Sequence, residues 1–294
     1  MSVNAREAAK LFDSNKLSAL ADGDFSFVKH VASDYLDADF KTSHIVDIYE
    51  DVYKRLGNEY RSEYFFKNTI AARKLLGTHS LKTATMLSEF RVGRSKADCV
   101  ILNGKSTCYE IKTEYDTLAR LDEQLNDYLT LFDEVFVVCS EKNLESVLNH
   151  ANERVGILEL TSRNYLSQKR PALRREAPID IDVMMRSLRK DEYIEITKRT
   201  TGIVPNVPNG RLMSECHSLL KTVDPSCVET CFIEVLKKMR INNAMLINAL
   251  PSYLTNAVIS YQFSSKQTDA LKQIFSASKE QKCTYLISEE SSSS

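Results

Sequence analysis

The stretch SKADCVILNGKSTCYEIKTEYDTLARLDEQLNDY, residues 95–128, decides the fold that we predict. Its first half contains two short apolar runs, Cys99–Leu102 and Thr107–Thr113, and the Asn103-Gly104 dipeptide between them is typical of a tight hairpin turn. From about Thr117 to Phe132, leucines recur at helical spacing. We therefore expect two antiparallel strands followed by a helix.

Asp98, Glu110 and Lys112 are the chemically active groups on these strands. If Asn103-Gly104-Lys105 forms a three-residue loop, Asp98 lies opposite Glu110, and opposite residues share one face of the sheet. A two-residue turn would offset the register and put the two carboxylates on opposite faces. Glu110 and Lys112 share a face in either case, because they are two residues apart on one strand.

Two carboxylates held close together repel each other, and burial raises that cost, so a divalent cation would stabilise the pair. Their oxygen ligands suit Mg²⁺ or Mn²⁺ rather than zinc. Such an ion polarises a phosphate oxygen and lowers the pKa of a bound water, and Lys112 would position that water or offset the growing charge. The alternative is that Asp98, Glu110 and Lys112 are ordinary surface charges at strand ends.

Glu63 is a further candidate, on a helix predicted at about residues 59–76. It falls within an apolar arc of that helix, where a carboxylate needs a partner. The alternative is an edge glutamate that pairs with Lys67 one turn later.

The helix after Lys112 carries a second stripe beside its buried leucines, formed by Arg120, Gln124 and Tyr128. Groups at the edge of a buried face can reach toward a site on the sheet. The alternative is a solvated flank, which we favour for Arg120 alone.

Taken together, these residues resemble the PD-(D/E)XK nuclease superfamily over roughly residues 59–160. The matching residues are Glu63, Asp98, Glu110-Ile111-Lys112 and the element Gln124–Tyr128. That last element is similar to the Q-x-x-x-Y subgroup, typified by the nuclease domain of the bacterial recombination exonuclease. The chain departs from the motif at Ala97, where the family often has proline.

The resemblance implies an α/β (α+β) fold of the restriction-endonuclease-like type, a mixed β-sheet core flanked by helices. It implies that Asp98, Glu110 and the main-chain carbonyl of Ile111 bind the metal, with Glu63 as a further ligand through water. It also implies that Lys112 is the catalytic lysine. Gln124 and Tyr128 would organise the site and the DNA end.

Composition divides the chain into five expected segments. Residues 1–57 are a helical N-terminal region, and residues 58–163 are the nuclease core, whose last strand is GILEL. A basic linker and helical segment at 164–210, a helical C-terminal region at 211–284 and a disordered tail at 285–294 follow. All six prolines come after position 170, which marks the change of architecture.

Positive charge gathers in the basic segment, which is one candidate for contacts with a DNA backbone. The alternative, weighed equally, is a solvated helix face balanced by neighbouring acids. The basic residues are Lys169, Arg170, Arg174, Arg175, Arg186, Arg189, Lys190, Lys198 and Arg199.

The bulk properties limit the function classes. The 294 residues carry a formal net charge of −1, so overall charge argues neither for nor against nucleic acid. Without an apolar run of about 18 residues, no membrane span is expected. Seven cysteines and an N-terminus without a signal-type apolar core favour reduced thiols in a cytoplasm.

We therefore expect a Mg²⁺- or Mn²⁺-dependent nuclease that acts on phosphodiester bonds, with DNA as the favoured substrate. Its setting would be repair, phage defence or a mobile element, in a bacterium or a phage. The alternative is a catalytically inactive protein of the same fold that binds nucleic acid or regulates a partner. A partner protein at the C-terminal helical region is a further expectation, and the oligomeric state stays open.

Overall fold

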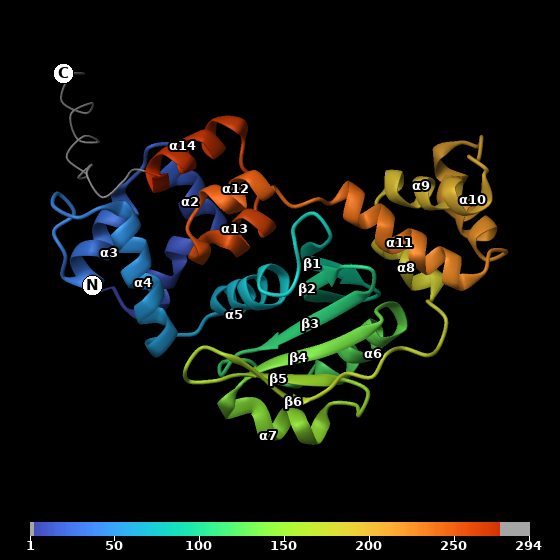
Figure 1. Ribbon diagram of the computed structural model, residues 1–294, viewed down its shortest axis with the longest axis horizontal. Helices are drawn as coiled ribbons and strands as arrows, with labels where there is room; N and C mark the ends of the chain where they lie inside the picture. Colours follow the sequence, from blue (N-terminus) through green and yellow to red (C-terminus); the bar gives the residue numbers. More distant parts are fainter. Residues whose placement is uncertain (1–2, 277–294) are drawn as a thin grey trace. The chain divides into compact units, whose positions relative to one another are not determined.

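The computed structural model describes residues 3–276, and residue contacts divide the chain into two compact units (Figure 1). Of the described residues, the helical unit joins 3–72 with 243–276, and the sheet unit comprises 73–242. Residues 243–276 of the expected C-terminal helical region thus fold with the N-terminal region, whereas its residues 211–242 belong to the sheet unit. The expected disordered tail, residues 285–294, lies outside the described residues.

The helical unit is held by contacts between its N-terminal and C-terminal parts. The Phe12 ring lies edge-on to the Tyr253 ring with centroids 6.4 Å apart. The Asn68 side chain donates to the carbonyl of Ser252 and accepts from the backbone N–H of Asn256. The elements of this unit are α1 (Ala5–Ala8), η1 (Ala9–Phe12), α2 (Ser14–Ala21), α3 (Ser26–Leu36), α4 (Ile45–Glu59), α5 (Glu63–Ile70), α12 (Ala244–Ala249), η3 (Ser252–Leu254), α13 (Thr255–Ser260) and α14 (Ser265–Ser276). The helix predicted at 59–76 is present as α5 and the π-helical segment η2 (Ala71–Leu76) that continues it.

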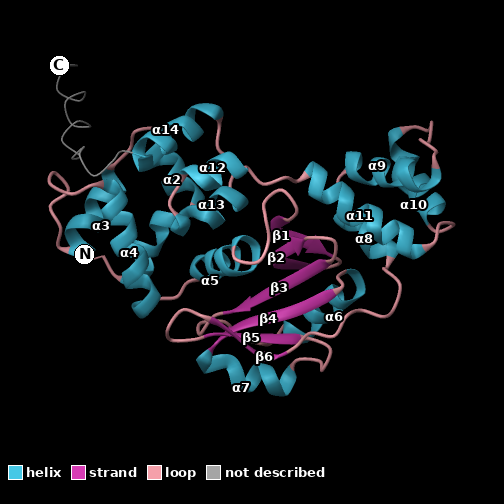
Figure 2. Cartoon of the chain, viewed as in Figure 1, coloured by secondary structure: helices cyan, strands magenta, loops and turns pink. Residues whose placement is uncertain are grey.

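The sheet unit contains a six-stranded mixed sheet in the order β1-β2-β3-β4-β5-β6 (Figure 2). The central pairs β3–β4 and β4–β5 are parallel, and the other three pairs are antiparallel. The strands are β1 (Thr85–Val92), β2 (Ser95–Leu102), β3 (Ser106–Lys112), β4 (Glu134–Ser140), β5 (Gly156–Leu160) and β6 (Leu166–Arg170). The expected mixed sheet flanked by helices is therefore confirmed.

The loop between β2 and β3 has three residues, Asn103–Lys105, and Gly104 there has a φ of +102°. The ladder pairs Leu102 with Ser106 and Cys99 with Tyr109. This is the register that the longer of the two predicted turns requires.

Two helices, α6 (Leu121–Leu131) and α7 (Glu141–His150), cross over between the parallel strands and pack on one face of the sheet. Cys108, Val137 and Ile157 belong to the buried cluster on this face, together with Tyr128 of α6 and Val147 of α7. Alternation along the strands puts Glu110 and Lys112 on the same face as Cys108. The face that buries the core therefore also carries the candidate chemistry.

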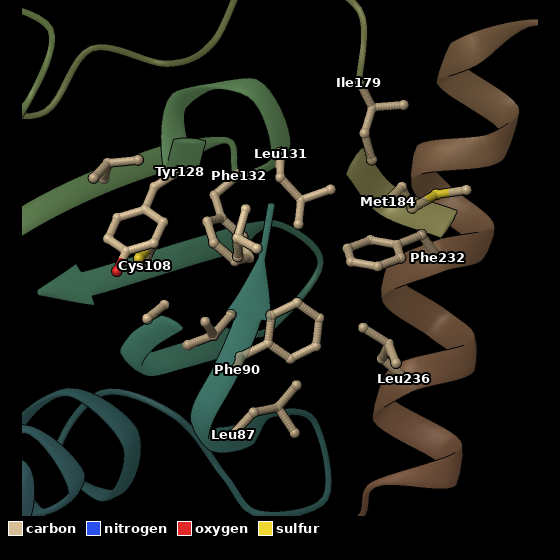
Figure 3. Packing of buried hydrophobic residues seen from close by; sticks show 14 of the residues in the cluster. Leu87, Phe90, Cys108, Tyr128, Leu131, Phe132, Ile179, Met184, Phe232 and Leu236 are labelled. Atoms are coloured by element: carbon tan, nitrogen blue, oxygen red, sulfur yellow. The ribbon is translucent and has the colours of Figure 1, made fainter. Parts of the chain in front are cut away.

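A cluster of four helices extends the core beyond β1: α8 (Ile181–Ser187), α9 (Lys190–Thr201), α10 (Asn209–Leu220) and α11 (Pro225–Met239). Figure 3 shows Leu87 and Phe90 of β1 beside Phe232 and Leu236 of α11. Met184 of α8 joins the same buried cluster. The basic segment thus supplies helices to the core of the sheet unit.

The prediction that GILEL is the last strand is wrong. LSQKR, residues 166–170, forms β6 and pairs antiparallel with β5 at the edge of the sheet. This strand has one open edge and two exposed polar residues, Gln168 and Lys169, so it lacks the apolar run by which buried strands are recognised.

At the opposite edge of the sheet, the side chain of Asn242 forms hydrogen bonds with the backbone of β1. The Asn242 amide accepts from the backbone N–H of Met86 at 2.8 Å and donates to the Met86 carbonyl at 2.9 Å. These two bonds satisfy backbone groups that an edge strand otherwise leaves to solvent. Within residues 3–276, no helix has the length and apolar character needed to cross a membrane.

Candidate functional site

The candidate site lies where the β2–β3 ladder stops. The last paired residues are Cys99 and Tyr109. Beyond them, Asp98 Oδ2 accepts a hydrogen bond of 2.7 Å from the backbone N–H of Ile111. If the register continued by one residue beyond this last pair, Asp98 would lie opposite Glu110, as the sequence predicts.

Glu110 is almost fully buried, with an exposed fraction of 2%, and its two carboxylate oxygens have different donors. Lys112 Nζ donates to Oε1 at 2.8 Å, and the Tyr128 hydroxyl donates to Oε2 at 2.9 Å. Lys112 Nζ also donates to Gln124 Oε1 at 3.0 Å. Four of the predicted site residues therefore form one hydrogen-bonded chain from Gln124 through Lys112 and Glu110 to Tyr128.

The surroundings of this chain keep Tyr128 protonated. Burial, followed by the charge of Glu110, raises the pKa of the Tyr128 phenol well above its usual range, so the hydroxyl stays a donor. Burial and the charges of Glu110 and Asp98 likewise raise the pKa of the Cys108 thiol. Because both carboxylates act on these two groups, the negative charge of the site is concentrated on the α6 side of the sheet.

Helix α6, which carries Gln124 and Tyr128, is fixed to the sheet at a third point. The Asp127 carboxylate accepts from the backbone N–H groups of Arg94 and Ser95, at 3.2 and 3.1 Å. Gly93 allows this approach, because a Cβ at this position would lie 3.0 Å from the Asp127 carboxylate. The φ of Gly93 is +57°, which also favours glycine. The Asp127 contact therefore holds α6 in place against the β1–β2 turn.

Hydrogen bonds also hold the loop after β3 in place. Thr113 donates from its backbone N–H and its hydroxyl to the Asp116 carboxylate, each at 2.7 Å. The Asn143 side chain of α7 donates to the Thr113 carbonyl at 2.6 Å. Our sequence prediction missed Asp127, Asp116 and Asn143 as supporting residues. The Thr-x-x-Asp spacing of residues 113–116 was an available local signal for the turn.

Glu63 belongs to the helical unit, in the first turn of α5. Its carboxylate forms an ion pair of 2.6 Å with Lys67, and its side chain is exposed. The pairing that the alternative interpretation expects is therefore present, and the ligand role of Glu63 stays a prediction. Arg120 is exposed at the N-cap position of α6.

Several cations of the basic segment are paired inside the protein. Lys169 pairs with Glu159 at 2.8 Å, and Arg175 pairs with Glu229 at 2.6 Å. Arg170 donates to three backbone carbonyls, and ion pairs also involve Arg174 and Arg199. These contacts favour the balanced, structural interpretation of this segment over a free DNA-binding surface.

Residues 57–262, most of the chain, match the family described as Bacteriophage P4 protein cII. The chain belongs to this family. The matched residues contain the whole sheet unit, and with it every member of the Gln124–Lys112–Glu110–Tyr128 chain.

One curated relative of this cII-family chain is Protein cII of Enterobacteria phage P4, which is 36% identical over 86 residues. The match covers 29% of this chain and 33% of the relative, so the chain spans about a third of that relative's length. Among solved structures, the SPO1766 protein of unknown function from Silicibacter pomeroyi is 17% identical, with a TM-score of 0.29. That comparison covers 37% of this chain and 70% of the other, and a likeness at this level carries no argument.

Proposed function

We propose that this cII-family chain is a metal-dependent nuclease that hydrolyses phosphodiester bonds in DNA. The observation that carries the proposal is the buried chain from Gln124 through Lys112 to Glu110, with Asp98 bonded to the backbone N–H of Ile111, the residue after Glu110. Charged side chains at an ordinary protein surface keep their charged end groups exposed to solvent. Here a lysine and a glutamate are nearly buried and held by an amide and a phenol, which is typical of a pre-organised site.

The donor atoms fit a hard divalent cation. Asp98, Glu110 and the Ile111 carbonyl would offer oxygen only. The Cys108 thiol on the same face has a raised pKa, so it stays protonated and is a poor metal ligand. Oxygen donors suit Mg²⁺ or Mn²⁺. When bound, the ion would polarise a phosphate oxygen and lower the pKa of a bound water.

The chain's own residues have separate roles in this proposal. Lys112 places a positive charge where negative charge grows on the phosphate during attack, and Gln124 limits the positions that its ammonium can occupy. Tyr128 fixes the orientation of the Glu110 carboxylate through Oε2. Membership of a phage protein family supports a phage or mobile-element setting, and a cytoplasmic location is part of the same proposal.

Cleavage of single-stranded, plasmid and linear duplex DNA in Mg²⁺, Mn²⁺ or EDTA tests the proposal. We expect metal-dependent cleavage by the wild type, with rates lowered about 10²- to 10³-fold by Asp98→Asn, Glu110→Gln or Lys112→Met, as for loss of one preorganised charge. RNA in a parallel reaction tests the assignment to DNA.

Glu159 and Lys169 provide a matched control for the same assay. Glu159 is a buried carboxylate paired with a lysine, and it lies on the same sheet face two strands from Glu110. Glu159→Gln and Lys169→Met should keep wild-type cleavage rates within about threefold, because neither residue is part of the Gln124–Lys112–Glu110–Tyr128 chain. Absence of wild-type cleavage, or an equal loss in the control pair, contradicts the proposal.

A non-catalytic nucleic-acid-binding or regulatory protein is the second candidate. Glu110 and Lys112 neutralise each other, so their burial is compensated without a metal. This candidate predicts DNA binding without cleavage and no change in thermal stability on addition of Mg²⁺.

A further inference from the structure

The parallel strands β3, β4 and β5 end at one common edge of the sheet, and Lys112 is the last residue of β3 there. Because β2 runs antiparallel to β3, the β1–β2 turn at Gly93-Arg94 lies at this edge as well. We call this edge, with the loops at 113–120 and 161–165, the strand-end edge. In open sheets that contain parallel strands, ligands bind preferentially at such an edge.

Two exposed aromatic rings stand on the loops of the strand-end edge. Tyr115 follows β3 and has an exposed fraction of 56%, and Tyr165 follows β5 and has 58%. Every other aromatic side chain within residues 3–276 is buried or half-buried. The strands that carry the two loops are separated by one strand, about 10 Å from axis to axis.

Both rings are presented by ordered loops. In the loop at 161–165, the Thr161 backbone N–H donates to the Tyr165 carbonyl at 2.9 Å, and Asn164 has a φ of +59°. The Arg73 guanidinium lies over the Tyr165 ring, 5.1 Å from its centroid. The backbone N–H of Tyr115 donates to the Thr113 hydroxyl at 3.3 Å, in the turn closed by Asp116. Ordering an exposed ring in this way lowers the entropy lost when a flat ligand stacks on it.

The turns and loops of the same edge carry three exposed arginines, beside the acids Glu114 and Asp116. Arg94, Arg120 and Arg163 are exposed and lie in its turns and loops. Within the part of the chain that the structure describes, no ion pair joins them to an acid, in contrast to Arg174 and Arg175 of the basic segment. Exposed guanidinium groups are suited to bind phosphates.

We propose that Tyr115 and Tyr165 are stacking platforms for unpaired bases, and that single-stranded DNA is the substrate class of the neighbouring site. This inference rests on the proposed nuclease function for its catalytic meaning. Stacking on an aromatic ring tolerates any base, while the arginines bind the backbone. A duplex keeps its bases stacked on one another, so it cannot offer their faces to the two rings.

Binding measured without cleavage tests this inference. The probes are a fluorescein-labelled oligo(dT) and a labelled hairpin duplex of the same number of phosphates, followed by anisotropy in EDTA. Tyr115→Ala and Tyr165→Ala should each weaken oligo(dT) binding about five- to a hundredfold, the range found for loss of one base–aromatic stack. Duplex binding should change less than about threefold.

Three controls separate stacking from other causes. Tyr115→Phe and Tyr165→Phe keep the ring and should bind oligo(dT) like the wild type. Leu173→Ala, an exposed apolar residue beyond β6 at the opposite edge of the sheet, should change nothing.

An equal loss on oligo(dT) and duplex, or a loss in the Phe variants, overturns the inference. Tighter binding of oligo(rU) than of oligo(dT) overturns the assignment to DNA. These outcomes are independent of cleavage. A wild type that cleaves DNA while the Ala variants bind normally refutes the stacking role alone, and a wild type that binds but never cleaves refutes the nuclease alone.

Discussion

Two buried glutamates of the sheet unit, Glu110 and Glu192, have the same exposed fraction of 2% and different partners. Glu192 accepts from Arg240 Nε at 2.6 Å, from Arg240 Nη2 at 2.7 Å and from the backbone N–H of Arg189 at 2.7 Å. Glu110 accepts one bond from Lys112 and one from Tyr128. The Arg240 guanidinium also lies over the Phe90 ring, 5.0 Å from its centroid.

The kind of donor distinguishes the structural contact of Glu192 from the candidate reactive contact of Glu110. A guanidinium is permanently charged and binds a carboxylate through a rigid fork, so the Glu192–Arg240 pair ties the start of α9 to the residue after α11. An ammonium is a point charge on a flexible stem, and Lys112 divides its donors between Glu110 and Gln124. Two equally buried glutamates can therefore differ in function. The Glu192–Arg240 pair is fixed, whereas the ammonium of Lys112 can turn from Glu110 to a third group.

The largest expected effect on the free energy of unfolding comes from removing the cationic partner of each glutamate. Arg240→Met leaves Glu192 buried without its charge partner and should lower the free energy of unfolding by about 3–5 kcal/mol, with or without Mg²⁺. Lys112→Met should cost a similar amount in EDTA but recover at least about 1.4 kcal/mol in Mg²⁺ at ten times its dissociation constant. Urea unfolding of both variants measures this. A Mg²⁺-independent loss for Lys112→Met would remove the distinction between the two glutamates.

A smaller effect is expected from Tyr128→Phe, which removes the phenol donor of Glu110 and leaves Lys112 in place. A hydrogen bond to a charged group contributes about 1.5–3 kcal/mol, so unfolding free energy should fall within that range. Tyr193→Phe is the matched control, because Tyr193 is a buried tyrosine of α9 without a carboxylate partner among the described residues. Equal losses in the two variants would show that the Tyr128 hydroxyl does not support Glu110.

The smallest effect concerns pH. Burial opposes ionisation of Glu192, but the bonds from Arg240 and from the Arg189 backbone outweigh it and hold the pKa of Glu192 below its ordinary value of 4.5. The stability from this ionised carboxylate is thus complete above about pH 4.5 and is lost as pH falls through the lowered pKa. The gap in unfolding free energy between wild type and Glu192→Gln should shrink as pH falls from 6 to 3. A gap that stays constant over this range would contradict the assignment.

Local patterns in the sequence predicted the β2–β3 hairpin and its neighbours well. Asn103-Gly104 located the turn, and strand alternation then placed Glu110 and Lys112 on one face. The leucine spacing after Thr117 located α6, from which Gln124 and Tyr128 reach Lys112 and Glu110. These features depend on residues close together in the chain, where periodicity is informative.

Features that depend on distant residues were not predicted. The sequence contains no local signal that Asp127 would bind the β1–β2 turn, or that the chain after residue 242 would fold with the N-terminal region while residues 211–242 fold with the sheet. β6 was missed because an edge strand with polar side chains lacks the pattern of a buried strand. The arginines of the basic segment looked available because their partners, such as Glu229 for Arg175, are far away in sequence.

The contact between Asn242 and Met86 has a consequence for association between molecules. An uncovered edge strand is a template on which another chain can add a strand, and β1 contains the apolar residues Met86, Leu87 and Phe90 that favour such growth. The Asn242 amide forms hydrogen bonds with both the N–H and the C=O of Met86. An added strand would need these two groups for its own pairing with β1. Asn242 therefore occupies the outward backbone groups of this strand at Met86, and we expect Asn242→Ala to leave that N–H and C=O without these partners while leaving every residue of the candidate site unchanged.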